Sequence, residues 1–209
     1  MDEKPKFKKT GKKQQTVEKD VFQNFNEYNK ILQIDSIARR YVAMNGFDGV
    51  LAILGVLISS YVAGIADAKL IIGICLGAAV AMAVSGIWGA YMAEAAERKK
   101  ELKELESTML TKLKKTKIGR AGQFASWIIA LVDGAAPFVA AMIVILPFFI
   151  VPVSTAYIAS FFIAFLLLFL LGVFLGNTAK ENLTLSGVKM LFAGIVIIII
   201  ILLLGIKVV

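Results

Sequence analysis

The stretch that decides the fold is Arg40 to Ala63, RYVAMNGFDGVLAILGVLISSYVA, an apolar run that carries one carboxylate, Asp48. A run of this length is sufficient to cross a bilayer. A charged group inside such a span is costly unless it is paired, hydrated or protonated, and it commonly marks an ion or proton path. The sequence therefore predicts a membrane span with a functional carboxylate at Asp48. The alternative is that Asp48 caps or hydrogen-bonds a neighbouring helix.

The composition places the whole chain in a membrane. Hydrophobic residues make up 58% of the 209 positions, which is too much apolar surface for a soluble core of this size. The 23 basic side chains exceed the 15 acidic ones, but they flank apolar runs and are not interleaved with stacking aromatics, so they indicate topology and not a nucleic-acid partner. Histidine is absent and Cys75 is the only cysteine, which leaves oxygen and methionine sulfur as metal ligands.

The apolar runs predict an all-α integral membrane protein with five transmembrane helices. Residues 1–40 form a basic cytosolic tail, in which 17–40 shows helical periodicity and is expected to be an amphipathic surface helix or a lead-in to the first span. Residues 41–209 form the membrane domain, with Pro147 and Pro152 bracketing the turn between the third and fourth spans. The expected spans are 42–63, 70–93, 124–147, 153–176 and 188–206.

The positive charges predict the orientation. Lys and Arg number ten in residues 1–40, one in 64–69, nine in 94–123, none in the Pro147 turn, two at Lys180 and Lys189, and one at Lys207. The positive-inside rule then places the N-terminus in the cytosol and the C-terminus outside. Residues 94–123 are expected to be a cytosolic helical continuation of the second span that Gly119 and Gly122 terminate.

Four carboxylates recur at helical spacing in this cytosolic segment. They fall at steps of three, four and three, which places them along one helix face: Glu94, Glu97, Glu101 and Glu104. Such a row offers oxygen ligands to a divalent cation. The alternative is a solvated face whose glutamates pair with neighbouring arginine and lysine side chains.

A second acidic residue, Asp133, lies inside the third span. It is followed by Gly134 and Pro137, and the proline removes the amide that would bond the carbonyl of Asp133. Carboxylate, glycine and freed carbonyl together predict either a polar site on an ion or proton path, or a kink.

Three motifs in this order resemble the vacuolar iron transporter family. They are Arg40 with Asp48-Gly49 in the first span, Ser85-Gly-Ile-Trp-Gly-Ala-Tyr91 in the second, and the segment from Gly176 to Gly194 before and within the fifth. The resemblance covers about residues 39 to 206. It implies a multi-pass homodimer, here of a prokaryotic cell membrane, that moves ferrous iron or manganese out of the cytosol in exchange for protons. The path would run between the first helices of the two copies, with Asp48 as the membrane carboxylate.

The chain departs from the family pattern at two positions on the implied path. The family's methionine falls at Gly86 and its glutamate at Ala90. Met82 lies four residues before Gly86, and Met44 lies four before Asp48, so each shares a helix face with the position it would serve. A thioether beside a carboxylate suits ferrous iron or manganese, although packing is the commoner role of a methionine.

Two functional classes follow from the sequence. The first is a divalent-metal transporter in which Asp48 binds a cation and a proton in turn, with the metal as cargo and no resident cofactor. The second is a non-transporting membrane scaffold, in which Asp48 and Asp133 cap helices and the basic segments bind anionic lipid. An enzyme is not expected, because the chain has no histidine to activate a serine nucleophile.

Overall fold

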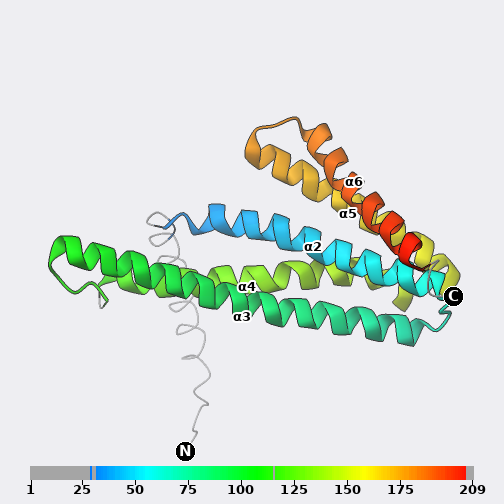
Figure 1. Ribbon diagram of the computed structural model, residues 1–209, viewed down its shortest axis with the longest axis horizontal. Coiled ribbons are helices and arrows are strands. Elements are labelled where there is room, and N and C mark those ends of the chain that lie inside the picture. The colour runs from blue at the N-terminus through cyan, green and yellow to red at the C-terminus, as the bar shows by residue number, and fades with distance from the viewer. Residues whose placement is uncertain (1–28, 30–31, 115, 206–209) are drawn as a thin grey trace, which may run out of the picture.

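The computed structural model describes residues 29, 32–114 and 116–205, and this part of the chain is helical without strands (Figure 1). Five of its helices are long and apolar enough to cross a membrane, which indicates a multi-pass membrane protein. A short 3-10 turn, η1, separates the third from the fourth. The bounds are α2 Ile34–Val62, α3 Ala68–Met109, α4 Lys117–Ile145, η1 Leu146–Phe149, α5 Val153–Ala179 and α6 Leu183–Gly205.

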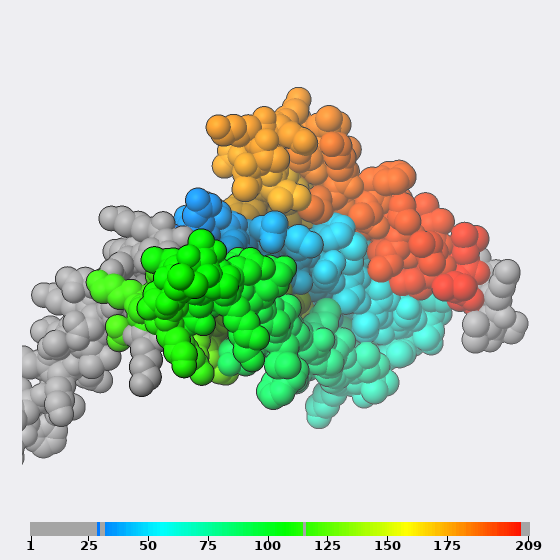
Figure 2. All heavy atoms as spheres, turned by 60° about the vertical axis from the view of Figure 1, so that its left-hand side comes forward, coloured from blue at the N-terminus to red at the C-terminus, as the bar shows by residue number. Residues whose placement is uncertain are grey.

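The helices form a three-helix bundle with a hairpin on one side. Helix α4 packs along both α2 and α3, and the α5–α6 hairpin packs against α2. Figure 1 shows the hairpin diverging from α2 toward its own turn, and Figure 2 shows that turn as a ridge above the rest of the molecule. The far part of α3 and the start of α4 extend together beyond the other helices. Because the chain's acidic and basic side chains gather there, we call this the charged end of the bundle, and the opposite end the apolar end.

The second span and residues 94–109 of the charged segment form one helix of 42 residues, α3. The predicted stop at Gly119 and Gly122 was wrong. Helix α3 ends earlier, at Met109, where Leu110 adopts a left-handed conformation with φ of 52°. A carboxylate oxygen of Glu106 accepts hydrogen bonds from the amides of Leu113 at 2.6 Å and Lys114 at 3.2 Å, which stabilises the turn. The Glu106 side chain therefore stabilises the turn between α3 and α4.

The two glycines lie inside α4 because they permit close packing there. A Cβ at Gly119 would lie 2.8 Å from the carbonyl oxygen of Leu113, and one at Gly122 would lie 3.4 Å from Cβ of Arg98. These glycines allow the preceding turn and Arg98 of α3 to approach the backbone of α4 closely. They leave α4 unbroken from Lys117 to Ile145.

The first and last helices are longer than their predicted spans. Helix α2 starts at Ile34, so residues 34–40 are a continuous lead-in to the first span, whereas 17–28 and 30–31 lie outside the described residues. Only residues 180–182 separate α5 from α6, so most of the hydrophilic link predicted between the last two spans is helical. A Cβ at Gly176 would lie 2.7 Å from Oγ of Ser186, which shows how closely the polar ends of α5 and α6 pack.

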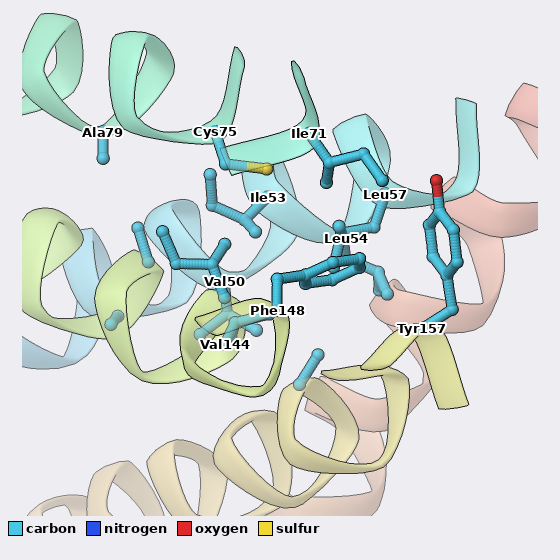
Figure 3. Close-up of a cluster of buried hydrophobic side chains, with 14 of the residues drawn as sticks. Val50, Ile53, Leu54, Leu57, Ile71, Cys75, Ala79, Val144, Phe148 and Tyr157 are labelled. Atoms are coloured by element: carbon cyan, nitrogen blue, oxygen red, sulfur yellow. The ribbon is translucent and has the colours of Figure 1, made fainter. Parts of the chain in front are cut away.

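An apolar core fills the bundle toward the apolar end (Figure 3). Side chains from α2, α3, α4 and η1 converge there, and their largest fully buried members include Ile53, Leu54, Leu57, Ile71 and Val144. Tyr157 of α5 closes this end, because its hydroxyl donates to the carbonyl oxygen of Ile65 at 3.0 Å and its ring packs edge-on against Phe148. The core separates the middle of the bundle from the apolar end.

Candidate functional site

The buried acid in the bundle is Asp133 of α4, which is 8% exposed. Nδ2 of Asn45 on α2 donates a hydrogen bond to Oδ1 of Asp133 at 2.5 Å. The same Nδ2 donates to the main-chain carbonyl of Tyr41 at 3.1 Å, one turn earlier on α2. Because both acceptors share one amide nitrogen, the side chain of Asn45 is fixed on Asp133 and joins α2 to α4.

Glycines on three helices allow this approach. A Cβ at Gly86 of α3 would lie 2.9 Å from Oδ2 of Asp133 and 2.9 Å from Cα of Gly134. A Cβ at Gly134 would collide with the carbonyl oxygen of Ala83. A Cβ at Gly49 of α2 would lie 2.6 Å from Cα of Pro137. The carboxylate of Asp133 therefore occupies the space over Gly86, where the resembled family has a methionine.

Pro137 adds a second acceptor at the same level. Helix α4 continues through this proline. Because proline has no amide hydrogen, the carbonyl oxygen of Asp133 lacks its donor four residues later. Asp133 thus carries a carboxylate that accepts from the Asn45 amide and a main-chain carbonyl that its own helix leaves free. A set of oxygens of this kind can bind a proton or a hard or borderline cation.

The row of glutamates on α3 is largely engaged in ion pairs. Glu94 lies 3.6 Å and Glu101 lies 2.9 Å from the guanidinium of Arg98, and Glu97 lies 3.9 Å from Nζ of Lys100. At Glu104 the main-chain carbonyl accepts from the hydroxyls of Ser107 and Thr108. The pairing agrees with the paired charges that the sequence left as the alternative, but Glu97 and Lys100 are solvated whereas Glu94 and Arg98 are shielded.

The remaining predicted metal ligands are spread apart within a single chain. Asp48 and Met44 are both exposed on α2, Met44 by 56%, whereas Met82 packs against the apolar core. Among the described residues, no group of three or more Asp, Glu or Cys side chains is arranged to hold a metal ion. Asp48 and Met44 do share a face, as the sequence predicted, but that face points out of the bundle.

Sequence analysis singled out Asp133 and Gly86 separately and missed Asn45. The available signal was an amide inside the first apolar run, three residues before Asp48. Positions 45 and 48 are three residues apart and lie on neighbouring parts of the α2 surface, so spacing does not separate them, and the packing of α2 on α4 identifies Asn45 as the residue that meets the buried acid.

The fold and the site define a helical multi-pass membrane protein with a carboxylate–amide pair buried between its spans. The sequence is 34% identical over 154 residues to an uncharacterized protein of Methanocaldococcus jannaschii, an alignment that covers 72% of this chain and 80% of the archaeal protein. The chain belongs to the same family as that protein. Neither a protein-family model nor a solved structure matches the sequence.

Proposed function

We propose that this protein is a transporter of a prokaryotic cell membrane that moves a divalent transition-metal cation, ferrous iron or manganese, out of the cytosol in exchange for protons. The observation that carries the proposal is the burial of Asp133 between α2, α3 and α4 with Asn45 as its hydrogen-bond donor. An ionisable residue inside a membrane bundle is expensive to place and commonly lies on an ion or proton path.

The chemistry of the pair suits an exchange of proton for cation. With a proton on Asp133, Nδ2 of Asn45 donates to the remaining acceptor oxygen. With a cation bound, half a turn of the Asn45 amide presents its oxygen as a ligand beside the carboxylate. The two occupants compete for the same oxygens, which is the coupling that an antiporter needs.

We also propose that two copies form a homodimer, and the position of Asp48 supports this assembly. Its carboxylate lies on an exposed face of α2, where contact with lipid would be costly. A second copy related by a two-fold axis would cover this face and bring two carboxylates together, each beside a Met44 thioether. The path between first helices implied by the family resemblance would then lie at the dimer interface, beside the Asp133 site of each copy.

A scaffold without transport activity is the second candidate, and the ion pairs on α3 favour it. Arg98 binds Glu94 and Glu101, so this part of the row has a structural partner without any metal. Replacement of Glu94, Glu97, Glu101 and Glu104 together by glutamine tests the point. Weaker metal binding to the detergent-solubilised protein, with the fold intact, would mean that the row gathers ions, and unchanged binding would leave it a row of paired charges.

A proteoliposome flux assay tests the proposed function directly. Purified protein would be assayed with ferrous iron, manganese, cobalt, zinc and calcium, with and without a pH gradient. We expect flux of iron or manganese that a pH gradient drives, and we expect Asp133→Asn to reduce it to background, because the amide carries neither the charge nor the exchangeable proton.

Two further variants locate the path. Asp67→Asn is the matched control: this exposed residue caps α3 by accepting from the amide of Lys69 at 2.8 Å, and asparagine caps equally well, so flux should persist. Asp48→Asn should also abolish flux if the path runs at the dimer interface. Flux that survives Asp48→Asn but not Asp133→Asn would place the path inside each copy, and absence of flux for every ion would favour the scaffold.

A further inference from the structure

A hydrogen bond links α2 to α3 between Asp133 and the charged end. The hydroxyl of Tyr41 donates to Oε1 of Glu94 at 3.4 Å. The carbonyl of the same tyrosine accepts from Asn45, whose amide holds Asp133. Tyr41 is therefore one hydrogen bond from the residue that holds the buried acid and one from the ion pairs of α3.

The ring of Tyr41 and the guanidinium of Arg98 close the bundle at this level. The ring packs against a small apolar cluster that includes Ala125 and Ile129 of α4. The side chain of Arg98 is 15% exposed, holds Glu94 and Glu101, and lies over Gly122 of α4. Its buried Nε has no hydrogen-bond partner among the described residues. All three helices thus meet above Asp133 through side chains of Tyr41, Glu94 and Arg98.

We infer that the Tyr41–Glu94 hydrogen bond is a gate that separates Asp133 from the water at the charged end. The inference rests on the proposed function, since a gate has a role only if Asp133 exchanges its proton or ion. The 3.4 Å separation is longer than the roughly 3.0 Å upper end usual for O–H···O hydrogen bonds, so this bond is weak, and Glu94 is shared with Arg98 at 3.6 Å. If the bond to Tyr41 breaks, Glu94 keeps Arg98 as its partner, so opening leaves no unpaired charge.

The opposite side of Asp133 has no comparable weak point among the described residues. There the bundle is filled by the apolar core of Val50, Ile53, Leu54 and Val144, all fully buried. Admitting water on that side would require several packed side chains to separate together. The charged side is held by fewer and more polar contacts, among which the Tyr41–Glu94 hydrogen bond links α2 to α3.

The test measures how readily a water-soluble carbodiimide, added with an amine nucleophile to inside-out membrane vesicles, modifies Asp133. Mass spectrometry quantifies the adduct, and Asp133→Asn identifies the peptide signal. Tyr41→Phe removes the hydroxyl but keeps the ring packing. Loss of one hydrogen bond of this kind shifts an open–closed equilibrium by about fivefold, so labelling of Asp133 should rise about fivefold. Glu94→Leu removes the acceptor and should raise labelling similarly.

Tyr91→Phe is the matched control. Tyr91 lies on α3 close in sequence to Glu94, but its ring packs on Trp127 with ring centroids 4.4 Å apart. Labelling of Asp133 in Tyr91→Phe should equal that in the unaltered protein. A lipid-soluble carbodiimide should modify Asp133 equally in Tyr41→Phe, Glu94→Leu and Tyr91→Phe, which would show that the acid itself reacts normally. The gate would be overturned if the aqueous reagent labelled Asp133 to the same extent in Tyr41→Phe and in the unaltered protein, whether that extent is high or zero.

The labelling result is independent of flux. If the unaltered protein transports no cation but Tyr41→Phe exposes Asp133, the gate stands and the proposed function falls. If metal flux is present but Tyr41→Phe leaves the labelling of Asp133 unchanged, the function stands and the gate falls.

Discussion

The two halves of the α2–α4 bundle are built by different forces. Toward the charged end, Asn45, Asp133, Tyr41 and Glu94 join the helices through hydrogen bonds. Toward the apolar end, the same three helices meet through aliphatic side chains such as Leu54 and Ile71, which Figure 3 shows converging on one core. Helices in lipid gain little from hydrophobic burial and associate through close packing and polar contacts. The bundle adds hydrogen bonds to close helix packing in one half and relies on aliphatic packing in the other.

This difference has a consequence for an ion path. Hydrogen bonds can be exchanged one at a time for contacts with water or an ion, whereas an interdigitated core opens only if several side chains move together. The polar half is therefore the half in which access to Asp133 can change, and the apolar half is the barrier. Substitutions in each half test this difference, and their expected effects on the free energy of unfolding decrease from the helix contact over Asp133 to the exposed ion pairs.

The largest effect is expected for Gly134→Ala, at the level where α3 and α4 touch. The new methyl group would collide with the carbonyl of Ala83 and crowd Ile87, so the helices must separate. Overpacking of backbone against backbone should lower the free energy of unfolding by about 3 kcal/mol, measured by unfolding in mixed micelles. Gly77→Ala on α3 is the control, since a Cβ there has no neighbour within 4 Å. Equal stability of the two variants would contradict the close approach over Asp133.

The next effect is expected for Leu54→Ala in the apolar half. Leu54 is fully buried, and its truncation leaves a cavity that its neighbours fill only in part. We expect a loss of about 2 kcal/mol, at the low end for such a change because burial from lipid carries little hydrophobic gain. The same unfolding measurement on Leu166→Ala, whose side chain is 46% exposed, provides the comparison. A loss as small as that of Leu166→Ala would mean that the core is not the barrier.

A smaller effect is expected for Tyr157→Phe at the apolar end. The substitution removes the hydrogen bond to the carbonyl of Ile65 but keeps the packing on Phe148, so stability should fall by about 1 kcal/mol. Tyr61→Phe is the control, because the described structure shows no hydrogen bond from the Tyr61 hydroxyl. Thermal unfolding followed by circular dichroism would compare them. If Tyr157→Phe costs nothing, the hydroxyl does not tie the loop after α2 to α5.

The smallest effect is expected for Glu97→Gln at the charged end. Its partner Lys100 is 3.9 Å away and both side chains are exposed, so water and salt screen the pair. The free energy of unfolding should change by less than about 0.5 kcal/mol. Glu94→Gln should cost more, because Glu94 is shielded and has two partners on two helices. A reversed order would remove the distinction between the polar network and the solvated face.

Local signals predicted the membrane class, the number of spans and the proline turn, because each depends on runs of residues that are contiguous in the chain. Helix ends were less predictable. Gly119 and Gly122 suggested a stop, but they serve close packing inside α4, and the actual turn depends on the Glu106 side chain that binds two later amides. The sequence alone does not distinguish a glycine that ends a helix from one that permits close packing, because the difference depends on the neighbours of the glycine in space.

The site shows the same division. The cost of an acid inside a span identified both Asp48 and Asp133 from the sequence alone, because that cost depends on the apolar run around each. Which of the two is buried within the chain was decided by the packing of α2 and α3 on α4, which turns Asn45 and Gly86 toward Asp133 and leaves Asp48 on the outer face. The apolar runs are enough to place both acids within candidate spans. Which acid has a partner follows from the packing, since hydrogen bonding depends on the rotation of each helix about its own axis.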